Sequence, residues 1–278
     1  MERPSLAGSL ASPESKRRYV RTLFATIADR YDLVTGLLSY GRDAAWKRML
    51  VDLSGAGPSV RALDLACGTG DIALALAARG ARATGLDITI RMLQIARAKT
   101  ASGARVDFLA GDMMALPFPS AAFDLVTTGY GIRNVPRIEP ALDEIARVLR
   151  PGGLLLSLDF DRPANGLLRA VYLGYLTVVG SALGWILHRD ADTYRYIPES
   201  IKRYPGASGV ATLLDRAGFT ERRVIPLLGG LMAINIARAP ASPKLAGASG
   251  AKAGPASPKL AHEPSRAQVG YDQRHGSF

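Results

Sequence analysis

The sequence predicts a doubly wound α/β fold, in which a parallel sheet is covered by helices on both faces. Between residues 60 and 160, short apolar segments of strand length alternate with segments of helix length. A glycine-rich turn, Cys67-Gly68-Thr69-Gly70, stands where the first strand passes into the first helix. Glycines at such a turn let the backbone approach a ligand closely. The pattern therefore predicts both the fold class and the edge of the sheet that binds a ligand.

The segment before the sheet, residues 16–50, has a helical pattern. Its apolar positions recur at three- and four-residue spacing, and they are Tyr19, Leu23, Ile27, Tyr31, Val34 and Leu38. We expect Gly36 and Gly41 to divide the segment into separate helices. Residues 1–15 are rich in Ser and Pro, and we expect them to be a flexible N-terminus.

Five strands and three helices are predicted next. The strands are residues 60–65, 82–87, 106–110, 123–128 and 154–160, and the helices are residues 71–78, 89–100 and 139–149. Thr89 is the expected N-cap of the second helix. A further helix at 208–217 precedes an antiparallel pair at 220–226 and 230–237, which brings the predicted sheet to seven strands.

An apolar segment, residues 166–187, interrupts this alternation and holds a single charge, Arg169. It reaches the roughly 20 residues that a membrane span needs. Its four glycines argue against a free-standing span. A buried helix pair and an amphipathic lid that touches lipid both fit the pattern, within a helical insertion at about 163–205.

The composition changes after Arg238, where residues 239–278 become rich in Ala, Ser, Pro, Gly and Lys. This segment is too poor in apolar residues to pack, and we expect a disordered tail. The predicted folded domain is therefore residues 16–238.

The chain carries a net charge of +11, which suits a nucleic acid, an anionic membrane surface or, most commonly, a solvated basic surface with no specific partner. No basic stripe with interleaved aromatic residues accompanies the charge, so nucleic acid is not an expected partner. One cysteine, Cys67, forms no internal disulfide, which fits a reducing cytoplasm. The first eleven residues lack the apolar region of a signal peptide.

The glycine turn suits either a dinucleotide or S-adenosylmethionine, and three residues distinguish them. A dinucleotide fingerprint requires a third glycine, at a position that Ala73 occupies. Asp71, directly after Gly70, would repel a pyrophosphate. Asp64, inside the strand, offers a partner for the ammonium group of a methionine moiety. The turn therefore predicts S-adenosylmethionine, with Gly68 and Gly70 close to it.

Acidic residues also end the next two strands. Asp87 is expected to accept hydrogen bonds from both ribose hydroxyls. Asp112 is expected to accept the adenine amino group, with Met113 against the ring. Because ligands bind at the carboxyl edge of parallel sheets, these side chains should converge. No cluster of Cys, His and carboxylates has the spacing of a metal site, so no metal is expected.

Several strings of the sequence resemble those of the UbiE/MenG family of C-methyltransferases, from about Phe24 to Ile236. The strings are residues 24–32, 115–119, 129–135, 147–153 and 190–196. Val34, Thr35 and Asp43 stand where the family has Met, Asn and His. Asp159 and Asp161 stand where it has Glu and Ser. The resemblance implies a class I methyltransferase that methylates the ring of ubiquinone or menaquinone precursors, with demethylmenaquinol favoured.

The resemblance also implies cofactor contacts at Thr69, Asp87, Asp112, Met113 and Gly129. The family usually has Ser at the last position, where glycine offers only its backbone. A substrate with a polyprenyl tail would make the apolar insertion a lid or tunnel wall resting on the membrane. We then expect a peripheral protein at the inner face of the cytoplasmic membrane, and a homodimer is one assembly that the sequence allows.

Arg133, Asn134 and Tyr31 are the candidate catalytic residues. Arg133 and Asn134 follow the fourth strand, where a substrate is expected, and Arg133 would stabilise a phenolate. Tyr31 offers a hydrogen bond to the substrate. Histidine is nearly excluded as the base, because two of the three, His262 and His275, fall in the tail. A sterol or polyketide methyltransferase is the alternative, followed by an RNA-binding protein or RNA methyltransferase.

Overall fold

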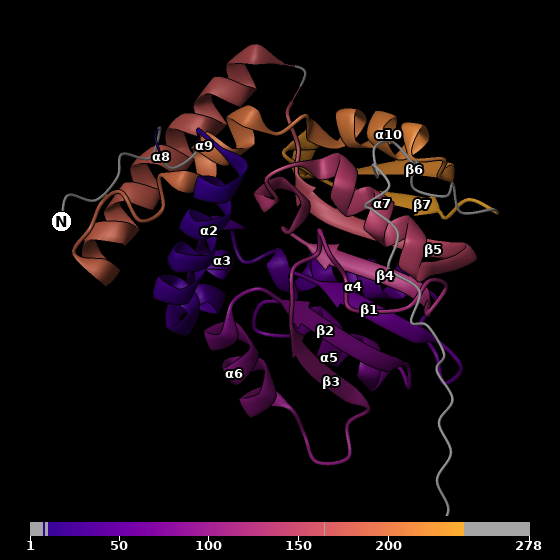
Figure 1. The fold of residues 1–278 in the computed structure, drawn as a ribbon. Coiled ribbons are helices and arrows are strands. Elements are labelled where there is room, and N and C mark those ends of the chain that lie inside the picture. The colour runs from indigo at the N-terminus through magenta and orange to yellow at the C-terminus, as the bar shows by residue number, and fades with distance from the viewer. Residues whose placement is uncertain (1–7, 9–10, 164, 242–278) are drawn as a thin grey trace, which may run out of the picture. The chain divides into compact units, whose positions relative to one another are not determined.

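A seven-stranded sheet forms the centre of the fold in the computed structural model, which describes residues 8, 11–163 and 165–241 (Figure 1). The strand order is β3-β2-β1-β4-β5-β7-β6. The first five strands are parallel, and β7 runs antiparallel to β5 and β6. The bounds are β1 Arg61–Leu65, β2 Arg82–Asp87, β3 Val106–Ala110, β4 Phe123–Gly129, β5 Leu149–Phe160, β6 Thr220–Leu227 and β7 Met232–Arg238. The predicted fold class is confirmed.

Helices cover both faces of the sheet. Since successive side chains of a strand point to opposite faces, β1 contributes to two cores. Leu63 and Leu65 pack into one core with α7 and α10, while Ala62 packs into the other with α4 and α5. The bounds of these helices are α4 Asp43–Leu53, α5 Asp71–Ala78, α7 Ile138–Val148 and α10 Gly206–Arg216, and α6 spans Ile90–Lys99.

The N-terminal helices divide at places other than those expected. α2 spans Pro13–Ile27, a 3-10 turn spans Ala28–Arg30, and α3 spans Tyr31–Leu38. Gly36 lies inside α3, so the break predicted there is wrong. Gly41 adopts a φ of +73°, which suits glycine, in the turn before α4.

The start of α2 lies inside the segment expected to be flexible. The Ser12 hydroxyl accepts the Ser15 N–H at 3.1 Å, and the Ser15 hydroxyl in turn accepts the Ser12 N–H. This reciprocal capping satisfies two N–H groups that a helix start leaves without partners. Residues 13–15 are therefore helical, which corrects the predicted boundary.

The apolar insertion is one long helix, α8 Gly166–His188, followed by α9 Tyr196–Arg203. It is not a helix pair. α8 buries Tyr172, Leu176, Gly180 and Gly184 at four-residue spacing, in a third core that α2, α3 and α9 share. A Cβ at Gly184 would lie 2.5 Å from the carbonyl oxygen of Asp190, so this glycine permits the close contact. Figure 1 shows α8 and α9 beside α2 and α3, away from the centre of the sheet.

By length and composition alone, α8 could cross a membrane, and it is the one such helix among the described residues. Of its most apolar window, 22% is buried inside the protein. The packing of its glycine-bearing face against α2, α3 and α9 makes α8 part of the folded domain.

Two further boundaries differ from the prediction, and one predicted N-cap lacks its side-chain hydrogen bond. β5 begins at Leu149, so Pro151, Gly152 and Gly153 continue a strand rather than form a loop. Thr89 occupies the N-cap position of α6, but its hydroxyl has no hydrogen-bond partner, and its N–H donates to Asp87 instead. Ala239 is buried and exchanges backbone hydrogen bonds with the residues at 152 and 153. The predicted tail from residue 242 onward lies outside the described residues.

Packing at Gly85 in β2 leaves no room for a side chain. A Cβ there would lie 2.7 Å from the Phe108 ring and 2.9 Å from the Cys67 sulfur. We expect Gly85→Ala to lower the free energy of unfolding by about 1–3 kcal/mol, the usual cost of overpacking. Urea denaturation measures it. Gly57→Ala is the control, since no atom lies within 4 Å of its Cβ, and equal effects of both variants would contradict the packing.

Candidate active site

A cavity opens at the carboxyl edge of the sheet and encloses about 710 Å³ of empty space. We call it the cofactor cavity. The ends of β1, β2, β3 and β4 form its floor, and α2 and Tyr31 form its roof. It collects five of the residues predicted from the sequence to hold the cofactor: Gly68, Asp87, Asp112, Met113 and Gly129.

Asp87 lies at the end of β2 and joins two loops of the cofactor cavity. One carboxylate oxygen accepts the Gly68 N–H at 2.9 Å, and the other accepts the Thr89 N–H at 2.8 Å. Burial raises the pKa of Asp87, and these two N–H groups oppose the shift. Each oxygen keeps a further acceptor site, as a ribose diol requires.

Asp112 and Met113 line the same cavity, after β3. Asp112 accepts the Met114 N–H at 2.9 Å and forms an ion pair with Arg17 of α2 at 2.8 Å. Met113 is buried. The Arg17 contact brings α2 over the cavity, and nothing in the local sequence around Asp112 indicates it.

Different constraints favour glycine at the two glycine positions of the turn, Gly68 and Gly70. Gly68 lines the cavity with a φ of +53°, and a Cβ there would meet only the Tyr31 ring, at 3.8 Å. Gly70 has a φ of +86° and lies behind the wall, where a Cβ would be 2.9 Å from that of Ala96. The open space at Gly68 is the kind of cradle that a bound ligand needs, whereas Gly70 is required by packing.

Asp64 and Thr69 also lie behind the cavity wall. Asp64 is 1% exposed, and one of its oxygens accepts the Thr127 hydroxyl at 2.8 Å while the other has no partner. Burial raises the pKa of Asp64 to about 7. The Thr69 hydroxyl donates to Asp32 at 2.6 Å, so it faces α3 instead of the cavity. An Asp64 oxygen without a partner agrees with the predicted pairing of this carboxylate with the ammonium group of the cofactor.

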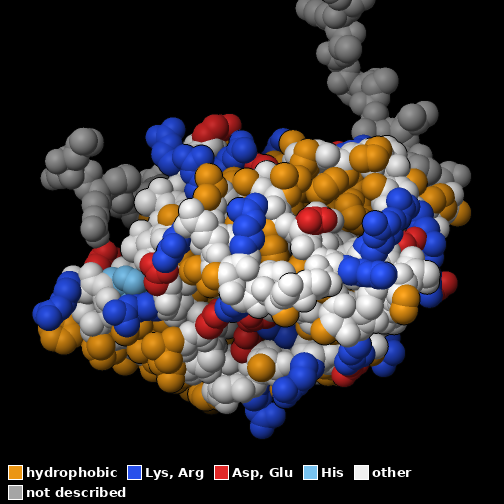
Figure 2. Space-filling model, turned by 90° about the horizontal axis from the view of Figure 1, so that it is seen from below, with side chains coloured by type: hydrophobic (Ala, Val, Ile, Leu, Met, Phe, Trp, Pro, Cys, Tyr) orange, Lys and Arg blue, Asp and Glu red, His pale blue; other side chains and the backbone are white. Residues whose placement is uncertain are grey.

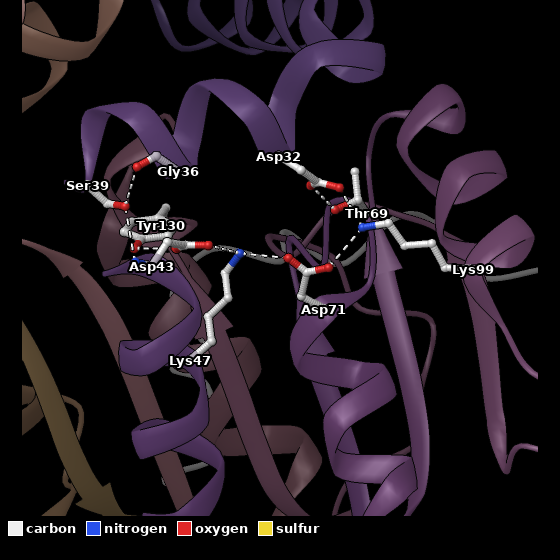
Figure 3. A network of polar contacts seen from close by, with 9 residues as sticks. All are labelled: Asp32, Gly36, Ser39, Asp43, Lys47, Thr69, Asp71, Lys99 and Tyr130. Carbon is white, nitrogen blue, oxygen red and sulfur yellow. Dashed lines mark hydrogen bonds and ion pairs between the residues drawn. The ribbon is translucent and has the colours of Figure 1, made fainter. Parts of the chain in front are cut away.

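A polar network fastens the N-terminal helices to the glycine turn (Figure 3). Lys99 of α6 donates to Asp32 at 2.6 Å and to Asp71 at 2.9 Å. Lys47 of α4 contacts Asp71 at 2.9 Å and Asp43 at 2.7 Å. Tyr130 donates to Asp43 at 2.7 Å. Asp71 is therefore paired with two lysines. The sequence alone indicates only that its negative charge would repel a pyrophosphate.

A second cavity, of about 700 Å³, adjoins the first. We call it the aromatic cavity. Phe24, Tyr31 and Tyr130 line both cavities. Further rings line the second alone, together with aliphatic side chains of α2 and α3, and they are Trp46, Phe160, Tyr172, Tyr194 and Tyr196. Burial raises the pKa of Tyr31, which keeps its hydroxyl protonated at neutral pH. A planar apolar ring fits this lining.

Arg133 brings a buried positive charge to the aromatic cavity. It lies in the 3-10 turn Ile132–Asn134 and pairs with Asp159 of β5 at 3.0 Å. Its guanidinium also donates to the Tyr130 carbonyl and lies 4.6 Å from the centre of the Phe160 ring. Although burial disfavours its charge, Asp159 holds the pKa of Arg133 above the ordinary value.

Asn134 faces the cofactor cavity beside Arg133. Its amide donates to the Tyr130 carbonyl at 2.7 Å and its oxygen accepts the Tyr196 hydroxyl at 3.0 Å. The structure thus brings together the three predicted catalytic residues around the boundary of the two cavities. The sequence does not indicate Asp159 and Tyr196 as their partners, although Tyr196 ends the family string 190–196 and Asp159 stands at a position where the family has Glu.

Among the described residues, no group of three or more His, Cys, Asp or Glu is arranged to hold a metal ion. The sheet order and the cavity at its carboxyl edge are those of the class I methyltransferase fold. Solved structures share this fold: a methyltransferase of that kind from Thermotoga maritima aligns with a TM-score of 0.58 and 20% identity over 79% of this chain and 99% of its own.

The sequence profile of the ubiE/COQ5 methyltransferase family matches residues 12–239, and the chain belongs to this family. It is 43% identical to a demethylmenaquinone methyltransferase of Thermus thermophilus, over 78% of this chain and 100% of the relative. It is 37% identical to a ubiquinone/menaquinone biosynthesis C-methyltransferase of Azotobacter vinelandii, over 82% and 93%. The family resemblance noted in the sequence is confirmed.

The raised pKa of Asp64 makes stability depend on pH. Between the unfolded pKa of about 4 and the folded value of about 7, only the folded chain holds the proton, so this contribution falls as pH rises. We expect Asp64→Asn to be more stable than the wild type at pH 8, by up to about 4 kcal/mol, and the difference to shrink toward pH 4. Urea denaturation at both pH values measures it.

Asp71→Asn is the matched control. Burial acts to raise the pKa of Asp71, but Lys47 and Lys99 lower it overall. The same experiment should therefore show a loss of stability at pH 8. A difference between wild type and Asp64→Asn that does not change with pH would contradict the assignment.

Proposed function

We propose that this protein transfers a methyl group from S-adenosylmethionine to a ring carbon of a polyprenyl quinol, with demethylmenaquinol as the favoured substrate. The observation that carries the proposal is the pair of adjoining cavities, one lined by carboxylates and glycines and the other by aromatic rings with a buried arginine. The names of the Thermus and Azotobacter relatives support a quinone ring as the acceptor.

We assign the cofactor to Asp87, Asp112, Met113 and the backbone at Gly68 and Gly129. Asp87 would hold the ribose hydroxyls, and Asp112 with Met113 would hold the adenine. Asp64 would act from behind the wall, through its unpartnered oxygen, on the ammonium group. Thr69 supports the turn through Asp32.

The sulfonium group of the cofactor supplies an electrophilic methyl when it is bound. The protein has to make a ring carbon nucleophilic, which occurs when a ring hydroxyl loses its proton and charge spreads to the ortho carbon. Phenols titrate near pH 10. A buried cation beside the ring stabilises the phenolate and lowers that barrier. We assign this role to Arg133, because it lines the aromatic cavity and remains charged.

Asn134 and Tyr31 would orient the ring. Tyr31 lies between the cavities, and Asn134 is held by Tyr130 and Tyr196. His188, the histidine among the described residues, bonds to the Tyr194 hydroxyl at 2.9 Å and lines neither cavity, so it does not serve as the base. The hydroxyl proton would leave to water, and Arg133 would stabilise the phenolate that remains. After the ring carbon accepts the methyl group, it would lose its own proton to water and restore the aromatic ring.

The exposed face of α8 would meet the membrane in which a polyprenyl substrate dissolves. Leu167, Val171, Val178 and Trp185 point away from the buried face, and each is more than 60% exposed. Arg189, at the end of the helix, lies over the Trp185 ring and would meet anionic headgroups. Figure 2 shows hydrophobic side chains gathered at its left edge, the side on which α8 lies in Figure 1. These features support peripheral binding at the cytoplasmic membrane as part of the proposal.

The quinone content of cells that lack this protein tests the proposal. Accumulation of demethylmenaquinone would support the favoured substrate, and accumulation of a demethylated ubiquinone precursor would select the other quinone. A normal quinone profile would overturn the proposal in favour of a sterol or polyketide acceptor, for which the aromatic cavity offers the same lining.

Removing Arg133 should abolish turnover and spare cofactor binding. Because Asp159 would be left buried and unpaired, the variant to test is Arg133→Met combined with Asp159→Asn. We expect turnover to fall by about 100-fold or more, the size of the effect when one stabilising donor is lost. The affinity for S-adenosylhomocysteine, measured by calorimetry, should remain within about threefold. Asp159→Asn alone is the control, and unchanged turnover in the double variant would remove Arg133 from the mechanism.

Charges on the exposed face of α8 should weaken membrane binding. We expect Val178→Glu with Trp185→Glu to reduce flotation with vesicles of phosphatidylglycerol and phosphatidylcholine by about tenfold, because both side chains are exposed. Turnover of a quinol with a short, water-soluble tail should remain unchanged. Ile90→Glu is the control, since Ile90 is also 62% exposed but lies on α6. Equal losses in both variants would contradict a specific face.

A further inference from the structure

The tail of the proposed quinol has to leave the aromatic cavity through the protein surface, because its far end stays in the membrane. Most residues that line this cavity are buried, and the half-buried ones mark where it can open. Thr35 of α3, Ile197 of α9 and Leu228 of the turn between β6 and β7 are three of them. Phe24 and Tyr31 are two more, and they face the cofactor cavity. The polarity of the nearby surface distinguishes these routes.

Charged side chains lie beside two of the routes. On α9, Glu199 follows Ile197 by two residues and pairs with Lys202. Over the cofactor cavity, Arg17 of α2 pairs with Asp112 at 2.8 Å. An apolar chain that covered either pair would remove charges from water and offer them no new partner. Both routes therefore suit a polyprenyl tail poorly.

The seam between α3 and α8 has an apolar surface instead. These two helices pack side by side (Figure 1). Leu33 and Leu37 lie four residues apart, on one face of α3, and each is at least half exposed. Val171 of α8 is exposed as well, one turn before Tyr175. A tail that leaves by this seam passes from the cavity to the surface that we assign to the membrane.

Residues of the seam lead from the cavity to the surface in two steps. Ser39 and Tyr172 of α8 are buried and line the aromatic cavity. Tyr40 and Tyr175, which follow them by one and three residues, stack with their ring centres 5.1 Å apart. Tyr40 is half exposed. The stacked pair is therefore the outer end of a seam whose inner end is the cavity wall.

The backbone of Tyr40 adopts a conformation that disfavours residues other than glycine. Its φ is +54°, and the residue after it, Gly41, has a φ of +73°. Strained residues of this kind persist where surrounding contacts enforce them, and they cluster at ligand clamps. At Tyr40 the contact is the stacked ring of Tyr175 on another helix. The strain is thus a second observation that points to the same pair.

We propose that the polyprenyl tail passes through the seam between α3 and α8, where Tyr40 and Tyr175 separate to admit it and then flank it. This route rests on the proposed function, since it concerns the quinol named there. Tyrosine rings present a large apolar surface and keep a polar hydroxyl for water, which suits the place where a tail leaves the protein. The pair positions the tail and selects for it, and it takes no part in the chemistry.

A photoreactive quinol locates the tail. The probe is a demethylmenaquinol with a tail of two isoprene units and a diazirine in the second unit, dissolved without lipid or detergent. The full chain is irradiated with this probe and S-adenosylhomocysteine, and labelled peptides are identified by mass spectrometry. We expect labels within residues 31–42 and 166–178. Labels confined to α9 or to the turn between β6 and β7, or labels that excess unmodified quinol does not reduce, would overturn the proposal.

A charge in the seam should penalise the tail and spare the ring. Tyr40→Glu should lower kcat/KM about tenfold for the quinol with two isoprene units, because the carboxylate would lose water to an apolar chain. The value for a quinol without a tail should remain unchanged. Tyr40→Phe keeps the stacked ring and should behave as the wild type. Ile90→Glu is the matched control, since Ile90 is exposed on α6, outside the seam.

The two quinols separate failure of the route from failure of the proposed function. If the wild type methylates neither quinol, the proposed function fails. If it methylates both, and Tyr40→Glu lowers kcat/KM equally for the two or no more than Ile90→Glu does, the route through the seam is wrong while the proposed function stands.

Discussion

Lys47 connects the N-terminal helices to the glycine turn, and both cavities depend on that connection. Its side chain is 12% exposed and lies between Asp43 and Asp71, and neighbouring charges raise its pKa above the ordinary lysine value despite the burial. Loss of one member of such a buried group would leave an uncompensated charge, at a cost of about 3–5 kcal/mol. Lys99 repeats the arrangement between Asp71 and Asp32. The two lysines hold α3 and α4 above the sheet edge, where they complete the walls that the strands begin.

This arrangement explains why the chain needs helices before its sheet. The carboxyl ends of β1 to β4 supply polar groups and glycine, which suit a nucleoside and an amino acid. The same strand ends carry few large apolar side chains. α2, α3 and α8 bring the aromatic and aliphatic side chains that close the aromatic cavity. The two cavities, which we assign to the methyl donor and to its acceptor, thus draw on different parts of the chain and share Tyr31.

Local patterns in the sequence were sufficient for the sheet and for much of the cofactor cavity. Strands with apolar residues and a glycine turn have short-range signals, and Asp87 and Asp112 follow from the rule that parallel strands present their carboxyl ends together. Element ends were predicted less well. Gly36 continues a helix because tertiary packing outweighs its low propensity. Pro151 enters β5 in an irregular stretch, between the point where Leu149 pairs with Phe123 and the point where Leu154 pairs with Leu125 of β4.

The partners of the site residues could not be predicted, because they lie far away in the sequence. Thr69 bonds to Asp32, 37 residues earlier, and Lys16 bonds to Val135, 119 residues later. The sequence around Asp71 does not indicate its ion pairs, because the two lysines come from separate helices. Single-sequence patterns identify which residues reach the sheet edge, whereas the contacts between them depend on how α2, α3 and α4 fold back.

Tyr31, Phe24 and Tyr130 belong to both cavities, so no movement of these rings changes one cavity alone. Occupancy of either site restricts rotations that the other site also uses. Thermodynamic linkage then makes the effect mutual: whatever factor the first ligand applies to the affinity of the second, the second applies to the first. If the methyl donor and its acceptor occupy these cavities, as we propose, a shared wall of three side chains is enough to couple their binding without a hinge or a domain movement.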